Sequence, residues 1–396
     1  MEHIVDQVSF GAIVLVRDRL LEQQARGRQV WRLESGDPSF DIAPHVREAI
    51  EKALRDGHTH YTASTGIPQL RDAIFRKVTE QNKLKVPNAD HVVVTNGGMN
   101  GLYIIFRAVV YPGDEVILPD PMWTEIAENI RLAGGTPVPV RLREEQGYQY
   151  DPAAIEAAIT PRTRAIFINT PHNPTGAVAS RETLQAIAAI AEKHNLTLIS
   201  DEAYEHVIFD GKEHVSLGSL PGAQDRTISV YSLSKTYAMS GLRVGYVITT
   251  HPVILERLKK LVRCTINGVN SITQHGATAA LNGPQDSTRA MAAEYQARRD
   301  VLCDALDESP YLTAFKPQGA FYVWCKMKPD WVGYQGAKDD WSLTNYLIDA
   351  AGIGSSPGTA FGASGAGHLR FAFSCSTAQV KGAAALLPKV LKEAKG

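Results

Sequence analysis

The sequence has 396 residues, of which 44% are hydrophobic and 21% charged, which is average for a globular protein. Its 41 Lys and Arg residues nearly balance 42 Asp and Glu residues, which argues against a nucleic-acid binder and leaves a small charged metabolite as a reasonable partner. The length suggests two domains. The four scattered cysteines indicate a reducing compartment and no zinc site, so we expect a cytoplasmic protein. We also expect no signal peptide and no membrane span.

Short β-rich runs alternate with helical patterns through the middle of the chain. The runs that read as buried strands cover residues 92–95, 115–118, 165–169, 197–200, 228–231 and 244–248. Between the third and fourth runs, Leu184, Ile187, Ala188 and Ala191 form one apolar helical stripe. This alternation predicts an α/β fold with a mostly parallel sheet, whose functional residues gather at the carboxyl ends of the strands.

The last hundred residues have a different pattern. A long, charged helix is expected over residues 291–306, and strand-like runs follow at 319–324 and 369–373. We therefore predict a second, smaller domain in this part of the chain.

The stretch 232–246 carries the most chemical information. Lys235 lies among hydroxyl-bearing and small residues, and Arg243 follows eight positions later. A lysine in such a turn can form a Schiff base (an imine) with an aldehyde, while Ser232, Ser234 and Arg243 bind a phosphate on the same molecule. An aldehyde and a phosphate on one cofactor indicate pyridoxal 5′-phosphate.

This segment resembles the lysine motif of the class I/II aminotransferases, which are fold-type I pyridoxal-phosphate enzymes. Matching landmarks run in the expected order from Gly36 to Arg370. The resemblance implies a large cofactor-binding α/β domain over residues 45–285 and a small α+β domain over 286–396 that recruits residues 1–44. It also implies a homodimer with shared active sites.

A Gly-Gly turn follows the first predicted strand. Free backbone N–H groups at a helix start attract a phosphate, and glycines let it approach closely. The resemblance assigns this cradle to the backbone of Gly98 and Met99. The G-x-G-x-x-G spacing of a dinucleotide site is not met there, which counts against a nicotinamide dehydrogenase on a similar sheet.

Asp201 ends a predicted buried strand, where a carboxylate is costly unless it is paired. A protonated pyridine nitrogen is a fitting partner, although a helix N-cap role is the alternative. The resemblance makes Asp201 the pyridinium partner and assigns Tyr204 and Asn173 to the phenolic oxygen of the cofactor. We interpret His172 as a loop residue and assign Glu202 no chemical role.

The resemblance assigns four further positions. Trp123 stacks on the pyridine ring, and Tyr61 reaches the phosphate in the neighbouring subunit. Arg370 binds the substrate α-carboxylate as a bidentate guanidinium, helped by the backbone of Gly36 and by Asn173; a structural salt bridge is the alternative for Arg370. A pair of histidines at 58 and 60 lacks a third ligand, so no metal site is expected.

These assignments predict a ping-pong aminotransferase in which Lys235 also moves the proton from the substrate Cα, with Asp201 and Tyr204 as the other catalytic residues. The expected partners are an amino acid and a 2-oxo acid, with aspartate or an aromatic or broad donor range. Met99 stands where some aspartate-type relatives have Lys, which puts strict aspartate specificity in doubt. A C–S lyase, a synthase or an oxidative variant with the same cofactor site stays an alternative.

Overall fold

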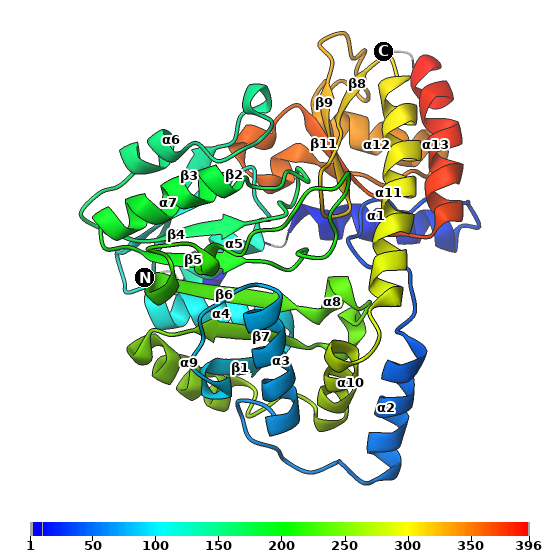
Figure 1. Ribbon diagram of the computed structural model, residues 1–396. Helices are drawn as coiled ribbons and strands as arrows, with labels where there is room; N and C mark the ends of the chain where they lie inside the picture. Colours follow the sequence, from blue (N-terminus) through cyan, green and yellow to red (C-terminus); the bar gives the residue numbers. More distant parts are fainter. Residues whose placement is uncertain (1–2, 10, 395–396) are drawn as a thin grey trace.

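A computed structural model describes residues 3–9 and 11–394. Two sheets organise this part of the chain, one mostly parallel and one antiparallel (Figure 1). The helices are α1 (Ala12–Ala25), α2 (Pro44–Arg55), α3 (Pro68–Glu80), α4 (Gly97–Val109), α5 (Glu125–Leu132), α6 (Pro152–Ala157), α7 (Arg181–Lys193), α8 (Leu233–Thr236), α9 (Pro252–Thr265), α10 (Ser271–Asn282), α11 (Asp286–Asp307), α12 (Asp340–Ala351) and α13 (Thr377–Lys392).

Within the described residues, the larger sheet has seven strands in the order β1-β7-β6-β5-β4-β2-β3. Only β7 runs antiparallel to its neighbours, which confirms the predicted α/β class. The strands are β1 (Val92–Thr95), β2 (Glu115–Asp120), β3 (Thr136–Arg141), β4 (Thr163–Asn169), β5 (Thr197–Asp201), β6 (Thr227–Ser232) and β7 (Gly245–Thr249). All the predicted strands are present. The edge strand β3 was not predicted, because the prolines of TPVPVR weaken the strand signal and are tolerated only at an edge.

Alternating side chains of this sheet enter two different cores. Val116 and Leu118 of β2 pack with α4, α5 and α9 on one face, whereas Ile117 between them packs with α7 on the other. The same second face is covered by α3 and α10 at the β1–β7 end. The predicted apolar stripe of α7 is buried as expected. Helices on both faces therefore leave only the strand ends open for a site.

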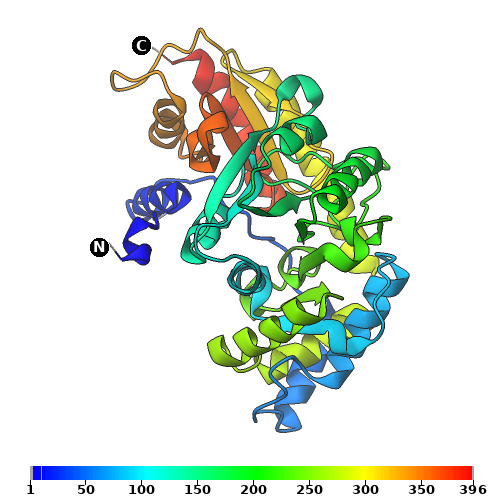
Figure 2. The ribbon, with the colours of Figure 1, turned by 90° about the vertical axis from the view of Figure 1, so that its left-hand side faces the viewer.

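The smaller sheet has the order β10-β11-β9-β8, with β8 (Leu312–Phe315), β9 (Tyr322–Met327), β10 (Ser356–Pro357) and β11 (His368–Ala372). Helices α11, α12 and α13 pack against it. The N-terminal helix α1 lies on the side of this sheet, well away from α2 and α3 (Figure 2), and Trp31 forms a bridge to Ile353. The exact domain boundaries stay a prediction.

No helix in residues 3–9 and 11–394 combines the length and the apolar character needed to cross a membrane.

Candidate active site

A cavity of about 500 Å³ lies where the carboxyl ends of β1, β4, β5 and β6 face the smaller sheet. Every residue that the sequence analysis singled out for the site lines it, except Tyr61. These residues are Gly36, Gly98, Met99, Trp123, Asn173, Asp201, Tyr204, Ser232, Ser234, Lys235, Arg243 and Arg370. The fold thus brings together residues up to about 330 positions apart in the sequence.

Lys235 lies in the single turn of α8, directly after β6. Its Nζ donates a hydrogen bond to the carbonyl oxygen of Gly36 at 2.7 Å. Burial lowers the pKa of Lys235 to about 8, with Arg243 and Arg370 adding to the effect and Asp37 opposing it. About a tenth of this amine is therefore neutral, and nucleophilic, at pH 7, far more than for an ordinary lysine.

Asp201 is the last residue of β5 and is 6% exposed. Its Oδ1 accepts a hydrogen bond from the backbone N–H of Ala203 at 3.1 Å, and it has no cationic partner in the described part of the chain. Burial raises the pKa of Asp201 to about 7, and the neighbouring charge of Glu202 adds to the rise. A cationic ring nitrogen in the cavity would stabilise this carboxylate, so the residue fits a pyridinium ring.

Arg370 extends from the centre of β11 and is 2% exposed. It donates hydrogen bonds to Asn173 Oδ1 at 3.0 Å and to the carbonyl oxygen of Glu34 at 2.7 Å, and its guanidinium lies 4.2 Å from the ring centre of Tyr322. No carboxylate of the described residues pairs with it, because the Glu34 side chain pairs with Arg32 at 2.6 Å. The buried Nε has no partner either. An anion entering the cavity would satisfy this charge.

The opposite end of the cavity is suited to a second anion. Gly97 and Gly98 begin α4, and the first turn of this helix lines the cavity together with Arg243, Ser232 and Ser234, so that free N–H groups, a guanidinium and two hydroxyls are available to one anion. A Cβ on Gly97 would lie 2.5 Å from Arg243 Nη2, so only glycine leaves room for this approach. Arg243 itself has a φ of 57°, a left-handed conformation that non-glycine residues adopt mainly where surrounding structure enforces it.

Aromatic side chains complete the cavity. The hydroxyl of Tyr204 lies 2.8 Å from that of Tyr322, and both are buried. Burial raises the pKa of each phenol, so both are hydrogen-bond donors at neutral pH. Asn173, beside them, receives support through its backbone N–H, which donates to Asn169 Oδ1 at 2.8 Å. Trp123 forms one wall of the cavity.

Tyr61 lies outside this cavity and is 91% exposed. It borders a separate hollow of about 360 Å³, formed by residues 59–62 and 266–271. The prediction that it reaches the phosphate of a neighbouring subunit stays a prediction. The histidine at 58 stacks on His275, with ring centres 4.2 Å apart.

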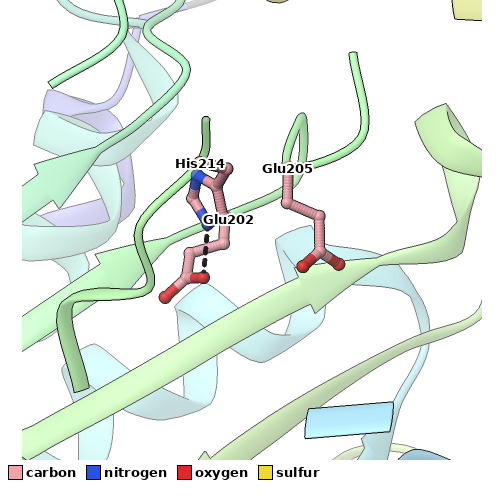
Figure 3. Close-up of side chains that lie close together, drawn as sticks. All are labelled: Glu202, Glu205 and His214. Carbon is pink, nitrogen blue, oxygen red and sulfur yellow. Dashed lines mark hydrogen bonds and ion pairs between the residues drawn. The ribbon is translucent and has the colours of Figure 1, made fainter. Parts of the chain in front are cut away.

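Next to Asp201 in the sequence begins a group of three side chains that could each offer a ligand atom to a metal ion: Glu202, Glu205 and His214 (Figure 3). These ligand atoms lie within 4.8 Å of one another. Glu202 accepts hydrogen bonds from His214 at 2.8 Å and from Ser216 at 2.5 Å. Glu205 forms an ion pair with the buried ammonium of Lys77. Both carboxylates are therefore already paired, and we interpret the cluster as a structural support for the end of β5. A metal ion bound there would be repelled by the positive charge of Lys77.

The sequence analysis missed other residues that line the cavity. Tyr322, Glu125 and Arg17 come from β9, α5 and α1, which approach the site only through packing of the smaller sheet and the N-terminal segment. The one sequence signal for Glu125 was its place two residues after Trp123.

Comparison with known proteins places these features in context. The sequence model of the family described as aminotransferase class I and II matches residues 28–387. The aspartate/prephenate aminotransferase of Thermus thermophilus is 37% identical over 97% of this chain and 96% of its own length, and the arginine–pyruvate transaminase of Pseudomonas aeruginosa is 38% identical over 89% and 87%.

Solved structures agree in fold. The aspartate aminotransferase of Thermus thermophilus with maleate superposes with a TM-score of 0.91 at 35% identity, over 99% of both chains. An alanine aminotransferase from Pyrococcus furiosus gives a TM-score of 0.92 at 33% identity over the full length of both.

Proposed function

The chain belongs to the class I and II aminotransferases and is an amino acid aminotransferase, and we propose that it uses pyridoxal 5′-phosphate to move an amino group from an L-amino acid to a 2-oxo acid in a ping-pong reaction. The observation that carries this proposal is the convergence of Lys235, Asp201 and Arg370 on one cavity. None of the three has an ion-pair partner within 4 Å in the described residues.

One part of the cavity is suited to the phosphate of the cofactor. The backbone N–H groups of Gly98 and Met99, the hydroxyls of Ser232 and Ser234 and the guanidinium of Arg243 hold the phosphate.

The middle of the cavity holds the ring. Trp123 would stack on its face, Asp201 would keep a proton on its nitrogen, and Tyr204 and Asn173 would donate hydrogen bonds to its phenolic oxygen. When bound, the cofactor supplies an electron-accepting ring that stabilises negative charge at the substrate Cα.

The substrate is oriented by Arg370, which binds the α-carboxylate together with Asn173 and the backbone of Gly36. Lys235 would hold the cofactor through its amine, and the same amine, when free and neutral, would remove the proton from the substrate Cα. The lowered pKa of Lys235 supports this role, because a base must be neutral before it accepts a proton.

We further propose that the enzyme is a cytoplasmic homodimer in which Tyr61 of each chain completes the phosphate site of the other. The exposure of Tyr61 and its place outside its own cavity support the shared site. The four free cysteines support a reducing compartment. The names of the relatives range from aspartate and prephenate to arginine, so substrate choice in this family depends on residues outside the shared cofactor site.

The test is a product assay with a panel of amino donors and 2-oxo acid acceptors. The proposal predicts one new amino acid for each new 2-oxo acid, and complete loss of this transfer in Lys235→Ala. Lys326→Ala, which removes an exposed lysine on β9, should behave as wild type. Release of ammonia or a thiol in place of a new amino acid would instead indicate the lyase or oxidative alternative.

A further inference from the structure

The cavity that Arg370 lines is also lined by apolar side chains from Ile13 and Val14 of α1, from Met99 and from Met122. Three carboxylates of the described residues line it, those of Glu34, Glu125 and Asp201. Glu34 pairs with Arg32, and Asp201 is assigned to the ring nitrogen, so Glu125 is the carboxylate left for the substrate.

Glu125 begins α5, is partly buried, and has no ion-pair partner in the described residues. Its carboxylate accepts a hydrogen bond from Thr124 Oγ1 at 3.2 Å. Burial raises the pKa of Glu125, and hydrogen bonds from its own backbone N–H and from Thr124, together with the charge of Arg370, offset only part of this effect. A carboxylate that is desolvated without a cation is costly, and a cation supplied by a ligand would stabilise it.

An acid in the first turn of a helix is often explained by the helix dipole alone. Glu128 of the same helix already fills that role, since it pairs with Arg131 at 3.1 Å and accepts a hydrogen bond from Ser9. Glu125 differs because it borders the cavity and lacks such partners.

Of the cations that line the cavity in the part of the chain that the structure describes, Arg17 is the one without a task in the proposed function. Its side chain is 49% exposed and pairs with Asp18 at 3.0 Å. A second carboxylate on the substrate would have to break that pair and would face repulsion from Glu125. These charges therefore favour a cationic side chain over an anionic one.

Resting on the aminotransferase function proposed above, we propose that Glu125 is a specificity-determining residue that selects amino donors whose side chain ends in a guanidinium or an ammonium group. The carboxylate of Glu125 binds this cation while Arg370 binds the α-carboxylate, and dicarboxylic donors are disfavoured.

The first experiment compares donors of similar length that differ in charge: arginine with citrulline, and lysine with norleucine, each with 2-oxoglutarate as acceptor. Wild type is expected to favour the cationic member at least about tenfold in kcat/KM. Glu125→Gln keeps the shape and removes the charge, so both ratios should fall toward one while citrulline and norleucine are little affected. Glu128→Gln, three residues along the same helix, should keep the wild-type ratios. The arginine and lysine pairs show which cation is preferred.

The second experiment measures equilibrium binding of unreactive analogues that lack the α-amino group, by calorimetry. Wild type should bind 5-guanidinopentanoate more tightly than hexanoate or glutarate, and Glu125→Gln should lose this preference. A wild-type preference for aspartate and glutarate that disappears in Arg17→Gln would overturn the proposal, as would cation preferences unchanged in Glu125→Gln. Absence of amino transfer from every donor would instead overturn the proposed function, and the binding preferences would still decide the role of Glu125.

Discussion

Lys235 owes its expected reactivity to the cavity around it. The amine is surrounded by protein and faces two guanidinium groups, Arg243 and Arg370, so the charged form is disfavoured. The same cavity raises the pKa of Asp201, because a buried carboxylate is also better neutral. Burial in one cavity therefore shifts the pKa values of an amine and of an acid toward neutral pH, where each group can exchange a proton.

This environment predicts how the cofactor-free protein reacts with trinitrobenzenesulfonate, which attacks neutral amines. Modification of Lys235 should rise with pH, reach half its maximum near pH 8 and level off above that. Lys326 should keep rising to higher pH, because its hydrogen bond to Glu144 raises its pKa. Peptide mapping by mass spectrometry at several pH values measures both rates, and identical profiles for the two lysines would contradict the account.

At the scale of elements, a buried ion pair connects the helices and strands next to the site. Lys77 of α3 reaches Glu205 in the turn after β5, and Asn82 donates a second hydrogen bond to Glu205 at 2.7 Å. Burial alone would raise the pKa of Glu205, but the charge of Lys77 holds it at about 2. The pair thereby joins α3 to the end of the strand that carries Asp201.

Removing the ammonium group of Lys77 should lower the stability of the fold. Lys77→Met leaves Glu205 buried and unpaired, so we expect a loss of about 3–5 kcal/mol in the free energy of unfolding at pH 7, measured by urea denaturation. The depressed pKa of Glu205 means that the pair stabilises the fold above the unfolded-state pKa, and that this stabilisation is lost as pH falls toward 2. The deficit of Lys77→Met should therefore shrink below about pH 4.

Two variants test this explanation. Lys85→Met removes an exposed lysine nearby and should leave stability within about 0.5 kcal/mol of wild type. Lys77→Met combined with Glu205→Gln should recover part of the loss, because a neutral amide costs less to bury than a charge. A deficit that is constant with pH would mean that packing, and not charge, dominates.

The sequence predicted the elements whose signals are local. Runs such as 165–169 and the stripe of α7 depend on short-range periodicity, and the residues around Lys235 form a contiguous motif. β3 was missed because its prolines suit only the edge position that the sheet gives it. Tyr322 and Glu125 were missed because they reach the cavity through tertiary packing, which no local pattern encodes.

At the scale of the whole molecule, the proposed dimer makes each active site depend on two chains. Lys235 and the phosphate cradle line one cavity, whereas Tyr61 of the same chain does not line it and is exposed. A tyrosine side chain that is 91% exposed packs against little of its own chain, so contact with a partner chain would explain its presence.

Mixed dimers test this sharing. A Lys235→Ala chain and a Tyr61→Ala chain, co-expressed, should form heterodimers with one fully wild-type site and one doubly defective site. Statistical pairing then gives at least about a quarter of wild-type activity, more than the mean of the two separate variants. Activity equal to that mean would show that Tyr61 acts within its own chain or not at all.

The covalent attachment of the cofactor to one amine is the most direct test of the account. Protein loaded with pyridoxal phosphate, reduced with borohydride, digested and mapped by mass spectrometry should carry a pyridoxyl group on Lys235 and on no other lysine. A label on another lysine, or none after reduction of fully loaded protein, would contradict it.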